Sequence, residues 1–243
     1  MSAYDRISRL YDSWSVSVVE DIPFYLDRAR RSGGPVVELG VGTGRLAVPI
    51  AADGIAVIGV DLSEGMLAIA SEQAELAGVT LDLRHGDFRD PPIDEIVPLV
   101  IVPFRSLLHM QTDDDRRAVL RAAHRLLEPG GTLIFDVFCP GPEDIAETHG
   151  RWLEREPGIY ERADWDEAAR TLILRVRGSA DENEPSVETE LGLAWISNSE
   201  WRTLLGEEGF IVDALYGWFD ETPWDDHEDA IWVCRKRDRV HEA

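Results

Sequence analysis

Strand-like apolar runs alternate with amphipathic stretches from the start of the chain to Phe138. The runs are residues 36–39, 55–60, 79–84, 96–102 and 132–138. In the stretches before and between them, at 17–31, 45–52, 63–76 and 113–127, apolar residues recur every three or four positions. The runs are typical of buried parallel strands and the stretches of amphipathic helices. Their alternation predicts an α/β fold, in which a doubly wound parallel sheet carries helices on both faces.

The pattern changes after Phe138. Residues 151–156, 159–165, 171–177 and 187–196 have the pattern of four strands with turns but no helix between them, which predicts a small antiparallel β insertion. A helix at 199–208 and two strands at 210–219 and 230–235 follow. We expect four segments: an N-terminal helical lid (1–34) that includes a helix at 4–10, a Rossmann-like core (35–149), an antiparallel lid over the substrate (150–197), and a completion of the core sheet (198–243).

One glycine-rich turn lies between the first strand and its helix. Gly40, Gly42 and Gly44 alternate with other residues directly after the apolar run, where the backbone must turn or approach a ligand closely. A dinucleotide-binding fingerprint would place its third glycine one residue later, where this chain has Arg45. The spacing from Glu38 is instead E-x-G-x-G-x-G.

Four polar or glycine-rich signals follow four predicted parallel strands. They are the turn 40–44, Asp61, Asp87 and the pair Pro103–Phe104. The carboxyl ends of parallel strands meet at one edge of the sheet, and ligands of open α/β sheets bind there. The sequence therefore predicts one ligand site along this edge.

These motifs resemble those of the class I S-adenosylmethionine (SAM) dependent methyltransferases. The resemblance covers most of the chain and rests on Tyr4-Asp5 to Tyr11-Asp12, Glu38 to Gly44, Val60 to Ser63 with Met66, Gly86 to Phe88, Leu127 to Gly131 with Leu133, and Gly209-Phe210. It implies a seven-stranded, Rossmann-like sheet whose last strand is antiparallel. It also implies SAM as cofactor and S-adenosylhomocysteine as product.

The resemblance assigns cofactor-binding roles to residues at the predicted edge. Gly40, Gly42 and Gly44 let the backbone pass under the methionyl part, and Asp61 accepts hydrogen bonds from the ribose hydroxyls. The adenine ring is expected against Leu62, Met66, Asp87 and the backbone of Phe88, with Phe104 near the methyl-transfer centre.

Several of these roles have alternatives. Glu38 either approaches the amino group of the cofactor or caps N–H groups of its own loop, and Arg45 either reaches the cofactor carboxylate or faces solvent. Met66 is also compatible with plain helix core. Tyr4 and Tyr11 either close over the cofactor, if the first helix is a lid, or are packing residues.

Methyl transfer needs few catalytic side chains, because alignment of nucleophile, methyl group and sulfur supplies most of the acceleration. A neutral amine needs no base, whereas a hydroxyl does. The candidates for catalysis are His109, Arg105 and Tyr11, and His109 could instead be a structural residue of its loop. An amine is the first choice of acceptor and an oxygen the second.

The insertion resembles the substrate lid of small-molecule N-methyltransferases that act on glycine, sarcosine or amino sugars. Candidate substrate-binding residues on its inner face are Arg151, Trp152, Arg175, Arg177 and Trp195. Strand alternation places Arg175 and Arg177 on the face opposite Leu172 and Leu174, where they are solvated or directed at an anionic group of the substrate.

Composition narrows the choice of partner. The formal net charge of −23 disfavours nucleic acid and anionic lipid as partners and is compatible with a small-molecule substrate. The two cysteines have no metal-ligand spacing, and no apolar run is long enough to cross a membrane, so we expect no metal and a cytoplasmic protein. The oligomeric state stays open, with a homodimer as one option. The rival functions are an NAD-dependent oxidoreductase and a SAM-binding protein without activity.

Overall fold

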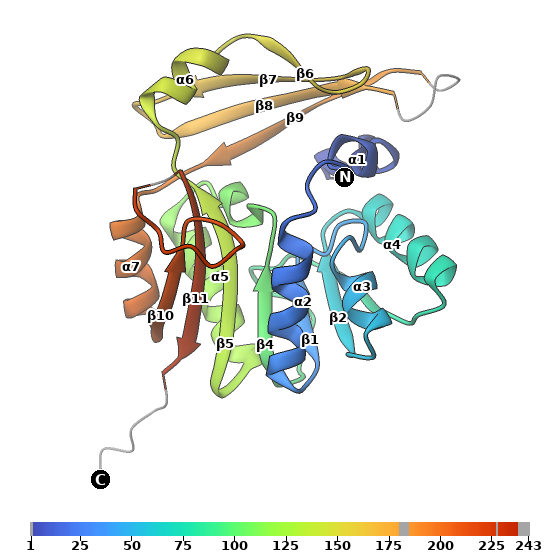
Figure 1. The fold of residues 1–243 in the computed structure, drawn as a ribbon, viewed down its shortest axis with the longest axis vertical. Helices are drawn as coiled ribbons and strands as arrows, with labels where there is room; N and C mark the ends of the chain where they lie inside the picture. Colours follow the sequence, from blue (N-terminus) through green and yellow to red (C-terminus); the bar gives the residue numbers. More distant parts are fainter. Residues whose placement is uncertain (1, 180–184, 227, 238–243) are drawn as a thin grey trace.

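The computed structural model describes residues 2–179, 185–226 and 228–237. Within these residues, seven strands form one sheet in the order β10-β11-β5-β4-β1-β2-β3 (Figure 1). The strands are β1 (Val36–Leu39), β2 (Val57–Asp61), β3 (Asp82–His85), β4 (Val97–Val102), β5 (Leu127–Phe138), β10 (Phe210–Tyr216) and β11 (Asp229–Lys236). Only the β11 pairings with β5 and β10 are antiparallel in this described sheet, so the predicted sheet with an antiparallel last strand is confirmed.

Helices cover both faces of this sheet. On one face, α2 (Asp21–Ser32) and α3 (Ala47–Ala52) bury Phe24 and Ile50 against Ile101 of β4. On the other face, α5 (Asp113–Leu126) and α7 (Asn198–Glu207) bury Val119 and Trp201 among strand residues. The helix α4 (Glu64–Ala77) lies beside α3, next to β2 and β3.

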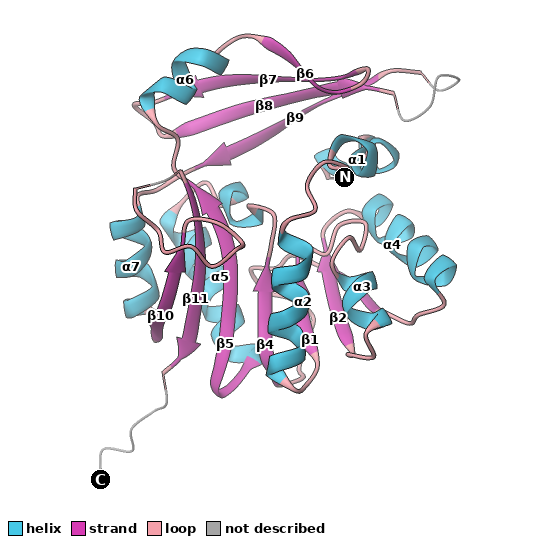
Figure 2. Ribbon diagram, viewed as in Figure 1, coloured by secondary structure: helices cyan, strands magenta, loops and turns pink. Residues whose placement is uncertain are grey.

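A second, antiparallel sheet lies above the carboxyl edge of the first (Figure 2). It consists of β6 (Trp152–Glu156), β7 (Ile159–Asp166), β8 (Thr171–Gly178) and β9 (Val187–Ala194), which confirms the predicted antiparallel insertion. Beneath it lie η1 (Ala3–Arg6) and α1 (Ser8–Trp14). Ile7, Leu10 and Trp14 of this segment pack against Val176 and Leu191 of the small sheet.

Some element boundaries differ from the prediction. The first helix is divided into η1 and α1, and the next begins at Asp21 rather than near residue 17. The strand β5 starts at Leu127, because a register shift against β4 accommodates the turn at 128–131. The helix α6 (Pro142–Thr148) was not predicted. It has seven residues, with proline in its first turn and Asp144 capping its start.

The chain order of the strands positions the ligand site. From β1 the chain moves to β2 and β3 on one side and then crosses back to β4 on the other side of β1. The strand order thus reverses at β1 and β4, and this reversal opens a crevice at their carboxyl ends. None of the helices in the described residues is long and apolar enough to cross a membrane.

Candidate active site

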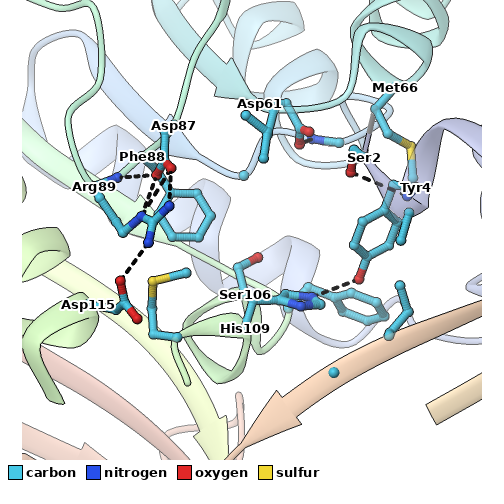
Figure 3. A pocket seen from close by; sticks show the side chains of 18 of the residues that line it. Ser2, Tyr4, Asp61, Met66, Asp87, Phe88, Arg89, Ser106, His109 and Asp115 are labelled. Carbon is cyan, nitrogen blue, oxygen red and sulfur yellow. Dashed lines mark hydrogen bonds and ion pairs between the residues drawn. The ribbon is translucent and has the colours of Figure 1, made fainter. Parts of the chain in front are cut away.

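A cavity of about 350 Å³ lies at the carboxyl ends of β1, β2 and β4, beneath the small sheet (Figure 3). Its walls include ten of the residues expected at the site: Tyr11, Gly40, Gly42, Asp61, Leu62, Met66, Asp87, Phe88, Phe104 and His109. The N-terminal residues Ser2, Ala3 and Tyr4 close one side, and Glu190 to Gly192 of β9 close another. Chain segments far apart in sequence therefore enclose a space suited to small-molecule ligands.

The glycine turn leaves room for a ligand at its centre. Gly42 has a φ of 55°, and a side chain built there would meet nothing within 4 Å although the residue lines the cavity. A Cβ at Gly44 would instead lie 3.2 Å from Val48, because this glycine packs against the following helices. Gly42 thus fits the expected approach of a ligand to the backbone, and Gly44 serves close packing of the turn.

Asp61 is fixed by backbone amides on both of its oxygens. Gly42 N–H donates to Oδ2 at 2.9 Å and Ser63 N–H donates to Oδ1 at 2.8 Å. Burial raises the pKa of Asp61, and these backbone hydrogen bonds oppose the rise. Each carboxylate oxygen has a further lone pair, so Asp61 can still accept from a ribose diol in the cavity.

Asp87 already has a cationic partner at the far end of the cavity (Figure 3). Arg89 donates to Asp87 Oδ2 at 2.6 Å and to Asp115 Oδ1 at 2.5 Å. The Arg89 hydrogen bonds lower the pKa of Asp87, so it is a carboxylate near neutral pH. It remains about one-third exposed and can accept from an adenine amino group.

Tyr4 and His109 form a hydrogen-bonded pair inside the cavity (Figure 3). The Tyr4 hydroxyl lies 2.9 Å from His109 Nε2, and the backbone of Gly192 also hydrogen-bonds the imidazole. Burial lowers the pKa of His109 to about 4 and raises the pKa of Tyr4. His109 is therefore neutral at physiological pH, and its Nε2 and the Tyr4 hydroxyl share one hydrogen bond.

The Tyr4 ring belongs to a group of three aromatic rings, with Tyr11 and Phe104. Tyr11 makes edge contacts with Tyr4 and Phe104, with ring centroids 6.0 Å and 6.2 Å apart. Burial raises the pKa of Tyr11, which keeps its phenol neutral and disfavours a role as base. The three rings form an aromatic wall, and aromatic faces attract cations such as a sulfonium.

Two aspartates attach the N-terminal segment to the glycine turn and to the residues that follow β2. Thr43 in the glycine turn donates to Asp12 at 2.5 Å. Ser63 donates to Asp5 at 2.5 Å, and Gly65 N–H donates to the same oxygen. These contacts hold Tyr4 and Tyr11 over the cavity.

Two expected cofactor residues lie behind the cavity wall. Glu38 is 2% exposed, and its Oε2 has no hydrogen-bond partner in the described residues. Burial raises the pKa of Glu38 to about 8. Arg45 does not line this cavity: its guanidinium makes two hydrogen bonds to Asp21, of 2.5 and 2.7 Å, and lies over Phe104, so it does not simply face solvent.

Arg105 is not brought to the cavity. Its side chain pairs with Asp229 at 2.6 Å and lies over the Phe138 ring, and it is not among the residues that line the cavity. The expectation of a catalytic Arg105 is therefore not supported by its placement.

Arg175 and Arg177, expected on the inner face of the insertion, lie on its outer face. Val176 and Leu172 point toward the N-terminal helix and the core, so Arg175 and Arg177 point away. Arg175 pairs with Asp164 and Glu190, and Arg177 lies over the Trp152 ring. Alternation in a strand separates the two sets, and the apolar set takes the buried side.

The other two expected substrate-binding residues do not line the cavity either. Arg151 is exposed at the start of the insertion. Trp195 is 7% exposed and packs edge-on against Trp165. Because its side chain is large and buried, Trp195 is a core residue between the two sheets.

Several residues of the cavity were not predicted from the sequence. Ser106, Met110 and Gln111 follow β4 on the same turn as His109, and Glu190, Leu191 and Gly192 belong to β9. The position of Ser106 close to His109 in sequence was a usable signal. The β9 residues gave none, because only the folded insertion brings them over the sheet edge. Within the described residues, no group of three or more His, Cys, Asp and Glu side chains could hold a metal ion.

Comparisons with known proteins identify a methyltransferase domain and related folds. A methyltransferase domain model matches residues 36–131. A protein of Geobacillus sp. (strain WCH70), provisionally named a methyltransferase, is 33% identical over 242 residues, 96% of each chain. The structure of the CcbJ methyltransferase from Streptomyces caelestis has a TM-score of 0.83 at 23% identity, covering 98% of this chain and 99% of that one.

A further solved structure holds the cofactor. SAM-bound CalS10 from Micromonospora echinaspora, an amino pentose methyltransferase, has a TM-score of 0.68 at 19% identity and covers 97% of each chain. In the present chain, the open space above Gly42 and the Asp61 carboxylate, which both line the cavity, fit the same cofactor. With a relative that is one-third identical over nearly its whole length, this chain belongs to the SAM-dependent methyltransferases.

Proposed function

We propose that this protein transfers a methyl group from SAM to a neutral amine of a small molecule. When bound, the cofactor supplies a methyl group on a positively charged sulfur. The observation that carries the choice of an amine is the buried His109, whose Nε2 already shares a 2.9 Å hydrogen bond with the Tyr4 hydroxyl and whose pKa burial lowers to about 4.

A hydroxyl acceptor is less well served by this cavity. A general base works best when its pKa lies near the working pH, and burial lowers the pKa of His109 to about 4. The buried phenols of Tyr4 and Tyr11 are neutral and weakly acidic, since burial raises the pKa of both. An amine needs none of these groups as a base, because its lone pair attacks directly.

The size and enclosure of the cavity support a small acceptor. The space of about 350 Å³ is covered by the N-terminal segment and by Leu191 and Gly192 of β9. The similarity to an amino pentose methyltransferase over 97% of the chain fits this class of acceptor.

The residues of the chain would act by binding and orientation. Asp61 holds the nucleoside end, and the rings of Tyr4, Tyr11 and Phe104 shield the reacting end from water. The amide of Gly42 donates to Asp61 and is not free for a phosphate, which argues against the dinucleotide alternative.

A screen of matched acceptors tests the proposal. Purified protein is incubated with SAM labelled in its methyl group and with pairs of amines and alcohols of the same carbon skeleton. We expect label in the amine of at least one pair and none in its alcohol. Transfer to alcohols alone, abolished by His109→Gln, would instead indicate an O-methyltransferase. Cofactor binding without transfer to any acceptor would indicate a SAM-binding protein.

A further inference from the structure

Two consecutive residues with side chains adopt the left-handed backbone conformation directly after β4. Phe104 has a φ of 55° and Arg105 a φ of 60°. This region is disfavoured for residues other than glycine, asparagine and aspartate, and it persists only where the surroundings enforce it. Such an outlier at the wall of a cavity indicates a functional constraint.

The constraint comes from one buried carboxylate on the neighbouring strand. Asp136 in β5 is 6% exposed and lies beside the end of β4. Phe104 N–H donates to its Oδ1 and Arg105 N–H donates to its Oδ2, both at 2.8 Å. The Tyr25 hydroxyl donates to Oδ1 at 2.7 Å. Successive amides in such a turn form an anion-binding concavity, and here the anion belongs to the protein itself.

This turn sets the position of three cavity residues. Phe104 lies in the turn, and its ring lines the cavity between Tyr11 and the Arg45 guanidinium. The helix η2 (Ser106–His109) begins immediately after the turn and carries Ser106 and His109 into the same cavity. A change of the backbone at residues 104 and 105 would displace all three side chains.

We propose that Asp136 is a positioning residue of the methyl-transfer site: its carboxylate holds the turn at Phe104 and Arg105 and thereby places Phe104, Ser106 and His109. The effect on methyl transfer rests on the proposed function. The hydrogen bonds from the Asp136 carboxylate to the turn at Phe104 and Arg105 do not depend on which acceptor is methylated.

The charge of Asp136 depends on pH in a useful range. Burial raises the pKa of Asp136 to about 6, and the Tyr25 hydrogen bond opposes the rise. The groups that face it are Tyr25 and Asp21 from α2 and Arg105 from the turn. Asp21 is bonded to Arg45, and Arg105 to Asp229 of β11. Protonation would replace one acceptor site with a donor facing the two amides.

The matched variants are Asp136→Asn and Tyr25→Phe. Asparagine keeps the shape but directs an NH₂ group at one of the two amides. We expect at least a tenfold weaker affinity for S-adenosylhomocysteine by calorimetry at pH 7.5, with an unchanged circular dichroism spectrum. The Tyr25→Phe variant keeps both amide bonds, so its affinity should stay within about twofold.

The pH profile separates positioning from general stability. Wild-type affinity should fall as pH drops from 7 to 5, and Asp136→Asn should show a flat, low profile. Because Tyr25 favours the charged form, Tyr25→Phe should move the wild-type midpoint to higher pH. A glycine in the turn tolerates the left-handed region, so Asp136→Asn with Arg105→Gly should recover part of the lost affinity.

Amide resonances give a readout that needs no cofactor. The backbone N–H signals of Phe104 and Arg105 should titrate together near pH 6 by NMR and lose this titration in Asp136→Asn. Folded Asp136→Asn protein with wild-type affinity and unchanged amide shifts would overturn the inference and leave the function intact. Wild-type protein that shows the amide titration but binds no SAM would instead overturn the proposed function.

Discussion

Asp12 in α1 accepts a 2.5 Å hydrogen bond from the hydroxyl of Thr43 in the glycine turn. The bond joins the N-terminal helix to the loop on which the cofactor is expected to lie. Thr43 is 2% exposed, so water does not readily replace Asp12 as its partner. We therefore expect cofactor exchange to require this contact to open together with the Asp5–Ser63 contact.

Removal of the Asp12 carboxylate should speed cofactor release. A hydrogen bond to a charged group stabilises by about 1.5–3 kcal/mol, so Asp12→Ala should raise the dissociation rate of SAM at least about tenfold. Stopped-flow displacement measures this rate. Asp27→Ala, which removes an exposed ion pair with Arg31, is the control and should leave the rate unchanged. On the Asp12→Ala background, Thr43→Val should add little; a full additional effect would show that the two residues act separately.

Loss of the Asp61 carboxylate should weaken cofactor binding more than it disturbs the fold. Asp61→Ala removes an expected acceptor for the ribose and releases the amides of Gly42 and Ser63. We expect a loss of about 1–3 kcal/mol in the binding free energy of SAM, measured by calorimetry. The control Glu64→Ala removes an exposed acid one turn away that does not line the cavity. Equal affinities of wild type and Asp61→Ala would refute the ribose assignment.

A side chain at Gly42 should block the cavity. No atom lies within 4 Å of a Cβ at this position, so valine there would project into the space expected for the cofactor. Gly42→Val should abolish SAM binding while the protein stays folded. Gly54→Val is matched, because Gly54 also has a positive φ and open space around it but lies away from the cavity. If Gly54→Val lost binding to the same extent, backbone strain rather than occupied space would be the cause.

The part of the site that follows from chain order was predictable. Parallel strands place their carboxyl ends at one edge, so Gly42, Asp61 and Asp87 had to lie near each other once the strands were recognised. The capping position of Ser63 is equally local, since its hydroxyl accepts from Met66 three residues later. The binding roles of these residues stay predictions.

The part of the site that depends on tertiary partners was not predictable. Arg45 bonds to Asp21, and only the packing of α2 on the glycine turn brings the two together. The alternation in β8 separates Arg175 from Leu174 but does not say which face meets the N-terminal helix. Asp136 lies within a continuous apolar strand, where a buried acid with three donors has no sequence signature.

The buried His109 should make stability depend on pH. Its pKa is lowered to about 4 in the folded protein, whereas an unfolded histidine titrates near about 6.5. As pH falls through this interval, the unfolded chain takes up the proton first. The free energy of unfolding should therefore decrease between about pH 6.5 and 4, by up to about 3 kcal/mol, and His109 should contribute no slope above this range.

Buried carboxyl groups with a raised pKa change the free energy of unfolding in the opposite direction. The contribution of His109 must therefore be measured as a difference between wild type and a variant. The pKa of Glu38 is raised to about 8, so its burial lowers stability as pH rises toward that value. Urea unfolding at pH 5, 6, 7 and 8 should be compared between wild type and His109→Gln, which keeps an acceptor for Tyr4. Relative to His109→Gln, the wild type should lose about 2 kcal/mol of stability between pH 7 and pH 5 and change little between pH 7 and 8. His85→Gln, at an exposed histidine, should follow the wild-type curve; a parallel displacement of His109→Gln at every pH would show that His109 is not held neutral by burial.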